Sequence, residues 1–178
     1  FSASIPASGS NTHNIHGNLE VKSGATFRIN QQSVAANSSV LLGGDLLVQG
    51  TLEGSNSNTT ATNAIIFNKT GTQSIDIDGT LNNHVTFQVN SGAELVLPQN
   101  LDLTNARNTL EILNGGTLNF NGFNVTGAGS LINNAGGTLK ITSPQGITSA
   151  GTTGNVHTTT RNYNSGGTYM YVGAASQS

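Results

Sequence analysis

The sequence predicts an all-β fold, a parallel β-helix (β-solenoid) of roughly eight coils of about 22 residues each. Two observations predict strands, because residues that favour helices are scarce and apolar residues alternate with polar ones over short segments. A third predicts their stacking, because one turn motif recurs with glycines at positions 92, 115 and 136, at nearly equal steps along the chain.

Alternation at period two defines the expected strands. A residue pattern of this kind buries one face of a strand of about three to five residues. No segment of the chain repeats apolar residues at helical spacing over several turns. The alternating pairs are Leu19 and Val21, Phe27 and Ile29, Phe87 and Val89, Leu95 and Leu97, Leu101 and Leu103, Leu110 and Ile112, Leu118 and Phe120, and Leu139 and Ile141.

The turn motif consists of a strand end, one further residue, a small or polar residue, Gly, then Ala or Gly, and a new strand. Its five copies are residues 21–29, 89–97, 112–120, 133–141 and 163–171. Glycine tolerates the positive φ that a sharp corner requires. Each unit is too small to bury its own apolar residues, so stacking of units must supply the core. The alternative fold is a β-sandwich, in which short strands recur about every 8–12 residues.

Asparagines accompany the expected turns. Asn83, Asn114 and Asn134 are tolerant of turn conformations. Asn side chains that stack from coil to coil can also form hydrogen-bonded ladders. Both roles fit the sequence.

Composition excludes several classes of function. The net charge is −2, and only 8% of residues are charged, without a basic cluster of the kind that binds phosphate backbones. We therefore expect no nucleic-acid partner. No apolar run approaches the length of about 20 residues that spans a bilayer, so we expect no membrane insertion. The chain has no cysteine, which excludes disulfides and thiolate sites.

Asp76 and Asp78 are the strongest candidates for chemistry. They flank Ile77 and point to the same side of a strand, where paired carboxylates can bind Ca²⁺ or act as acid and base. The pattern favours two solvent-facing side chains opposite a buried Ile77. We therefore predict no catalytic residue, no cofactor-binding residue and no cofactor, and keep Asp76 and Asp78 as the candidates for Ca²⁺.

Histidines and tyrosines give weaker signals. His13 and His16 have a spacing that can place two imidazoles on one metal, but no third ligand is evident, which favours a surface or turn role. Tyr163, Tyr169 and Tyr171 gather near the end of the sequence. Exposed aromatic rings can stack on sugars, but Tyr169 and Tyr171 alternate in register with core positions, which favours packing.

Two further patterns carry a resemblance. Residues 66–75 (IFNKTGTQSI) and 169–178 (YMYVGAASQS) share one pattern, and Gly-Thr-Leu occurs at 50–52, 79–81, 116–118 and 137–139. In these features the chain resembles repeat tracts of large Bacteroidetes surface proteins that are exported by the type IX secretion route. The resemblance covers most of residues 40–178, the expected solenoid. Residues 1–39 match less well and are expected to form an N-terminal cap or less regular first coils.

The resemblance implies a function as well as a fold. Members of that family are adhesins or surface-layer proteins, including some used in gliding. We therefore expect a secreted, extracellular, non-catalytic stalk or adhesin segment, which is no enzyme and binds surface glycans or other cell-surface proteins. Because the sequence stops within a repeat motif, we also expect an internal piece of a larger chain.

Two other functions fit the sequence. A glycan-binding or polysaccharide-cleaving β-helix protein would gather acids and cations in one groove. An ice-binding solenoid would need a repeated Thr-x-Thr face, whereas the Gly-Thr-Leu elements place one Thr in each turn.

Overall fold

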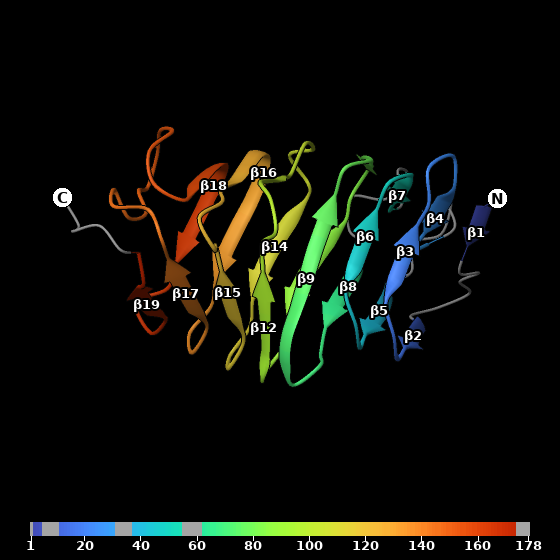
Figure 1. The fold of residues 1–178 in the computed structure, drawn as a ribbon, viewed down its shortest axis with the longest axis horizontal. Coiled ribbons are helices and arrows are strands. Elements are labelled where there is room, and N and C mark those ends of the chain that lie inside the picture. Colours follow the sequence, from blue (N-terminus) through green and yellow to red (C-terminus); the bar gives the residue numbers. More distant parts are fainter. Residues whose placement is uncertain (1, 5–10, 31–36, 55–61, 174–178) are drawn as a thin grey trace.

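Three parallel sheets form the molecule, and the chain passes through them in turn as it coils (Figure 1). The second and third sheets extend to the last coils, whereas the first ends at residue 82. The computed structural model describes residues 2–4, 11–30, 37–54 and 62–173. In these ranges every strand pair is parallel and no helix occurs, so none could cross a membrane. The β-solenoid is therefore confirmed, and the alternative β-sandwich, whose strands are antiparallel, is wrong.

The strands of each sheet come from successive coils. The first sheet contains β1 (Ser2–Ser4), β4 (Thr26–Arg28), β7 (Thr51–Glu53) and β10 (Thr80–Asn82). The second contains β2 (Asn11–Ile15), β5 (Ser38–Leu42), β8 (Asn63–Phe67), β11 (Thr86–Val89), β13 (Leu101–Asp102), β14 (Thr109–Ile112), β16 (Val125–Asn133) and β18 (Val156–Tyr163). The third contains β3 (Leu19–Val21), β6 (Leu46–Val48), β9 (Gly71–Ile77), β12 (Ala93–Val96), β15 (Thr117–Asn119), β17 (Thr138–Ile141) and β19 (Thr168–Tyr171).

Coil length varies more than the sequence motif indicates. In the central coils Thr109 pairs with Ser130, a sequence offset that matches the predicted repeat. The offset is clearly longer at the two ends of the second sheet, where Asn11 pairs with Ser38 and Val125 pairs with Val156. Because the outer coils are longer, the chain makes fewer than the eight coils predicted.

The predicted turn is present at all five copies of the motif. In each, the N–H at the fifth position of the motif donates to the carbonyl oxygen three residues earlier, at 2.9–3.1 Å; the donors are Ala25, Ala93, Gly116, Gly137 and Gly167. Four of the five turns contain a glycine with φ between 76° and 82°. Glycine is therefore needed for its left-handed conformation, as expected.

The first copy lies at a different corner from the other four. The turn at residues 22–25 links β3 to β4, and so joins the third sheet to the first. The later turns join the second sheet to the third, and they stack through hydrogen bonds such as Gly92 N–H to Gly115 O at 3.0 Å. The motif thus indicates a local turn and not a fixed corner of the coil.

The interior is filled by columns of apolar side chains from successive coils. One column of the second sheet contains Val40, Ile65, Phe87, Leu110 and Leu131, all fully buried. The strands β2 and β3 pair in register with β5 and β6 across the expected boundary at residue 39, and the division into a cap and a solenoid stays a prediction.

Candidate functional site

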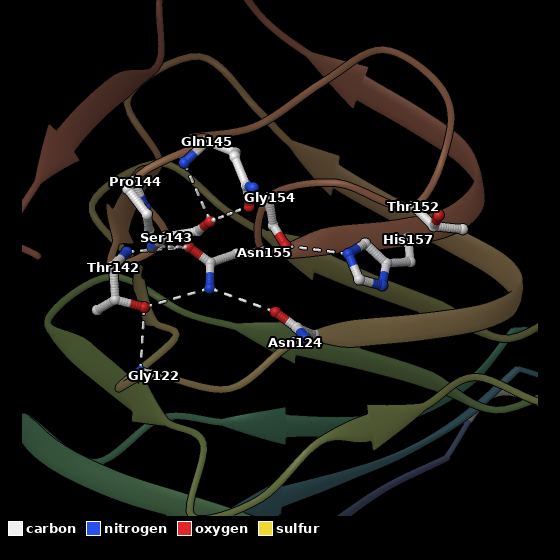
Figure 2. Close-up of a pocket in the computed structure, with 10 residues that line it drawn as sticks. All are labelled: Gly122, Asn124, Thr142, Ser143, Pro144, Gln145, Thr152, Gly154, Asn155 and His157. Carbon is white, nitrogen blue, oxygen red and sulfur yellow. Dashed lines mark hydrogen bonds between the residues drawn. The ribbon is translucent and has the colours of Figure 1, made fainter. Parts of the chain in front are cut away.

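A polar hollow of about 340 Å³ lies beside the segment that joins β17 to β18 (Figure 2). One wall comes from the corner at Gly122 and Asn124, and the others come from the joining segment and from the start of β18. The remaining lining residues are Thr142, Ser143, Pro144, Gln145, Thr152, Gly154, Asn155 and His157.

Asn155 fixes the base of this hollow. Its Oδ1 accepts hydrogen bonds from the N–H groups of Thr142 and Ser143 at 2.9 and 2.8 Å. Its Nδ2 donates to Phe123 O at 2.8 Å and to Thr142 Oγ1 at 3.2 Å. The side chain is buried and all of its hydrogen-bonding capacity is used within the protein, so Asn155 shapes the hollow and cannot itself bind a ligand.

The candidate pair Asp76 and Asp78 lies at the end of β9, on the outer face of the third sheet. Gln99, from the next coil, donates through Nε2 to Oδ1 of both carboxylates, at 2.5 and 2.8 Å. Ile75 is buried and Ile77 partly buried on the opposite side, as predicted. A neutral amide therefore bridges the pair.

The surroundings of Asp76 disfavour the charged form of its carboxyl group. Partial burial, followed by the nearby charge of Asp78, raises the pKa of Asp76, while the hydrogen bond from Gln99 opposes this change. Among the described residues, no group of three or more His, Cys, Asp or Glu side chains is arranged to hold a metal ion. The Ca²⁺ site at Asp76 and Asp78 stays a prediction, and the described residues group no third carboxylate or imidazole with the pair.

All eight carboxylate side chains of the sequence lie in described residues, and each accepts a hydrogen bond from a neighbour. Glu20 binds Lys22 within its own strand region. The other seven bond to a different coil, either to a side chain or to a backbone N–H. Their donors are Ser74 for Asp45, Arg28 and Asn83 for Glu53, Gln99 for Asp76 and Asp78, Asn119 and Lys140 for Glu94, Thr126 for Asp102, and Gln88 and Asn134 for Glu111.

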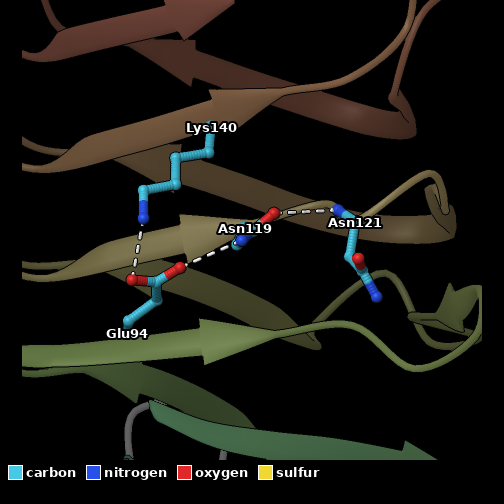
Figure 3. Close-up of polar contacts among 4 residues, drawn as sticks. All are labelled: Glu94, Asn119, Asn121 and Lys140. Atoms are coloured by element: carbon cyan, nitrogen blue, oxygen red, sulfur yellow. Dashed lines mark hydrogen bonds and ion pairs between the residues drawn. The ribbon is translucent and has the colours of Figure 1, made fainter. Parts of the chain in front are cut away.

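Glu94 shows the arrangement most clearly (Figure 3). One carboxylate oxygen accepts from Asn119 Nδ2 in the next coil at 2.9 Å. The other accepts from Lys140 Nζ, two coils away, at 2.8 Å. The hydrogen bond from Lys140 is the main reason that the pKa of Glu94 lies below its ordinary value. One side chain thus links three coils.

The remaining candidates are separated in the structure. His13 lies on β2 in register with the core residue Val40, whereas His16 follows the strand and is exposed. Asn83 and Asn134 donate to Glu53 and Glu111 instead of stacking on one another. Asn83 also has a φ of 60°, which fits its predicted role as a turn former.

The tyrosines lie near the last strands. Tyr163 and Tyr169 pack edge to face with ring centroids 6.2 Å apart, and both contact the core. Burial raises the pKa of Tyr163 to about 12. Tyr171 stays 52% exposed on β19, the last strand of its sheet. The predicted packing is confirmed for Tyr169 and is wrong for Tyr171, whose strand has no further described strand beside it to cover the side chain.

Three polar residues have structural roles that no sequence pattern indicated. Gln73 and Asn155 are buried, and Arg161 fixes the segment before β18 through the backbone carbonyls of Thr148 and Gly151. Gln73 was part of the motif at residues 66–75, so the motif marked its position without giving its role. No sequence signal singles out Asn155 among the many asparagines.

Comparison with known proteins adds no relative. No family model matches this chain, and neither a curated protein nor a solved structure is significantly similar to it.

Proposed function

We propose that this chain is a non-catalytic stalk or adhesive segment of a secreted bacterial cell-surface protein. The proposal rests on the use of carboxylates as links between coils, since seven of the eight bond to another coil. Acidic groups held in this way link the coils of a rod, whereas a hydrolytic site needs carboxylates that are free to exchange protons with a substrate.

The outer face of the third sheet supports an adhesive function. In register, one row contains Thr72, Thr117, Thr138 and Thr168, with Glu94 between the first two. Regular rows of neutral hydroxyl groups suit weak contacts that are repeated along a rod and gain strength from their number. The neighbouring outer row, by contrast, contains Ser74, Val96, Asn119, Lys140 and Met170, and so lacks the second threonine of an ice-binding face.

The resemblance to type IX exported surface proteins of Bacteroidetes gives this proposal its cellular setting. In that setting the chain is extracellular, forms part of a larger protein used in adhesion or gliding, and meets surface glycans or other cell-surface proteins. The threonine row, in which Glu94 is the one charged side chain, fits partners of low charge density.

Adhesion and turnover can be measured together. Beads coated with the chain are passed over immobilised bacterial polysaccharides, and released reducing ends are assayed in the same material. We expect bead retention without release of reducing ends. Release that is abolished by Asp76→Asn and Asp78→Asn would instead establish the polysaccharide-cleaving alternative, and absence of retention on every surface would refute the adhesive function.

A further inference from the structure

The polar hollow lies at the coil whose length differs most from the lengths of the neighbouring coils. Val125 is in register with Val156, the longest sequence offset among the described strand pairs, and the two preceding coils are clearly shorter. The additional residues form the segment between Ile141 and Val156, and they add a wall that the tight corners of the other central coils lack.

Side chains hold this added segment at several points. Arg161, on β18, donates to Thr148 O at 3.0 Å and to Gly151 O at 2.5 Å. The hydroxyl of Tyr163 donates to Thr148 O at 3.2 Å, and Asn155 binds the N–H groups at the start of the segment. A segment fixed in this way presents a preformed surface, which lowers the entropy cost of binding a ligand.

Polar groups with unused hydrogen-bonding capacity face this hollow. Thr142 Oγ1 accepts from Gly122 N–H and from Asn155 Nδ2, so its own hydrogen is left to donate. His157 Nε2 lies 3.0 Å from Gly154 O and must donate to it, which leaves Nδ1 of the neutral ring as an acceptor. Gln145 Nε2 and Thr152 Oγ1 bond to no other described residue, and both residues line the hollow (Figure 2).

The chemistry of these groups selects a class of ligand. None of the ten lining residues is Lys, Arg, Asp or Glu, so an ionic ligand would lose its hydration without gaining a counter-charge. Alternating donors and acceptors match hydroxyl groups, which can both donate and accept. Beyond the lining residues, the largely exposed ring of Tyr171 lies against Gly146 and offers an apolar surface.

We propose that the hollow between residues 122–124 and 142–157 binds a single neutral sugar residue of a surface glycan. The proposal deepens the adhesive function and rests on it for the identity of the partner, but the site itself is testable alone. Thr142, Gln145, Thr152 and His157 contact the sugar hydroxyls, and Asn155 and Arg161 act as positioning residues.

Titration of the ¹⁵N-labelled chain tests the site directly. The probes are D-glucose, D-galactose, D-mannose and N-acetyl-D-glucosamine, with D-glucuronate as the charged comparison, and amide shifts are followed by NMR. We expect at least one neutral sugar to produce saturable shifts that centre on residues 142–157. The site is refuted if none of the four neutral sugars produces them, if the shifts centre elsewhere, or if glucuronate binds more tightly.

Two variants locate the contacts. Thr152→Val and Gln145→Ala each remove one group with free hydrogen-bonding capacity, and each is expected to weaken sugar binding by about 3- to 10-fold. Thr80→Val is the matched control, because it removes an exposed threonine hydroxyl on β10 of the first sheet, outside both the hollow and the threonine row of the third sheet. Binding that is weakened equally by Thr80→Val, or by none of the three, would place the sugar elsewhere.

Bead retention on polysaccharide separates this site from the proposed function. If the chain adheres and the Thr152→Val, Gln145→Ala double variant adheres equally well, adhesion is correct and the hollow is not its site. If the hollow binds sugars in solution while no surface retains the beads, the site is correct and the adhesive function is wrong.

Discussion

At the scale of single residues, Gln73 occupies an apolar column position. In register it precedes Leu95, Leu118 and Leu139, and its side chain is buried. The amide donates to the carbonyl oxygens of Leu42 and Gly44 and accepts from Lys69 N–H. The glutamine therefore satisfies backbone groups at a corner where the chain bends, which a leucine cannot do.

Gln73→Leu tests this role. The substitution restores the apolar column but leaves the Lys69 N–H and the Gly44 carbonyl without their partner, so we expect a loss of about 1–3 kcal/mol in the free energy of unfolding. Urea denaturation measures the loss, and Ser74→Ala, on the outer face of the same strand, is the control. An unchanged or raised stability would mean that the buried amide contributes nothing.

The raised pKa of Asp76 has a consequence for acid stability. A carboxylate whose folded pKa exceeds its unfolded value destabilises the fold once it is ionised. That cost disappears as pH falls through the folded pKa toward the unfolded value. We expect Asp76→Asn, which keeps an acceptor for Gln99, to be more stable than the wild type at neutral pH and equal to it in acid. Denaturant titrations at both pH values measure this, and a stability difference independent of pH would contradict it.

At the scale of elements, the stacked glycine turns join the second sheet to the third. Gly92 and Gly136 share a left-handed φ, but their surroundings differ. A Cβ on Gly92 would lie 3.6 Å from Thr70 Oγ1, whereas one on Gly136 would lie only 2.1 Å from Asn114 Oδ1. Gly166 occupies the same turn position in the next coil with a φ outside this region, and its nearest contact would be 3.3 Å.

Alanine substitutions separate backbone strain from crowding. Gly92→Ala is expected to cost about 1–2 kcal/mol of unfolding free energy from backbone strain alone. Gly136→Ala should cost more because the Asn114 side chain must move, and Gly166→Ala should cost least. Thermal unfolding ranks the three variants, and the reverse order would contradict the assigned turn conformations.

The link between Glu94 and Lys140 predicts an opposite dependence on pH. Because the pKa of Glu94 is lowered, its contribution to stability is present above the unfolded pKa and is lost as pH falls through the folded value. Lys140→Met should therefore reduce stability by less than about 1 kcal/mol at neutral pH and by nothing in acid. Urea unfolding at neutral and acid pH measures the difference, and an equal loss at both would assign the effect to packing.

The sequence predicted the strands and turns, because these depend mainly on residues that are close together in the chain. Alternation located strands such as β14 and β17, because a side chain's face is set by its parity along the strand. The glycine motif predicted all five turns, since turn geometry depends on neighbouring residues alone. It could not assign residues 22–25 to their corner, because the corner is set by the sheet on which the next strand packs. Nor could it foresee the hollow, which depends on contacts of Arg161 with Thr148 and Gly151, well before it in the chain.

At the scale of the whole molecule, stability is distributed along one dimension. Each coil contacts mainly the coils before and after it, so stability is close to a sum of coil and interface contributions. Glu53, Glu94 and Glu111 each bond to two other coils. Each of these three side chains therefore couples the stability of three coils.

The direction of the interstrand hydrogen bonds determines how the rod responds to mechanical load. β3 and β19 lie at opposite ends of the third sheet, so tension between the ends pulls along the hydrogen bonds and opens them one coil at a time (Figure 1). A freed coil of roughly 20 to 30 residues extends by roughly 70–110 Å when drawn out. Optical-trap pulling should therefore show a staircase of such steps at low force. In the proposed stalk, this stepwise extension would lengthen the tether gradually under a sudden load and so limit the peak force that reaches the attached cell.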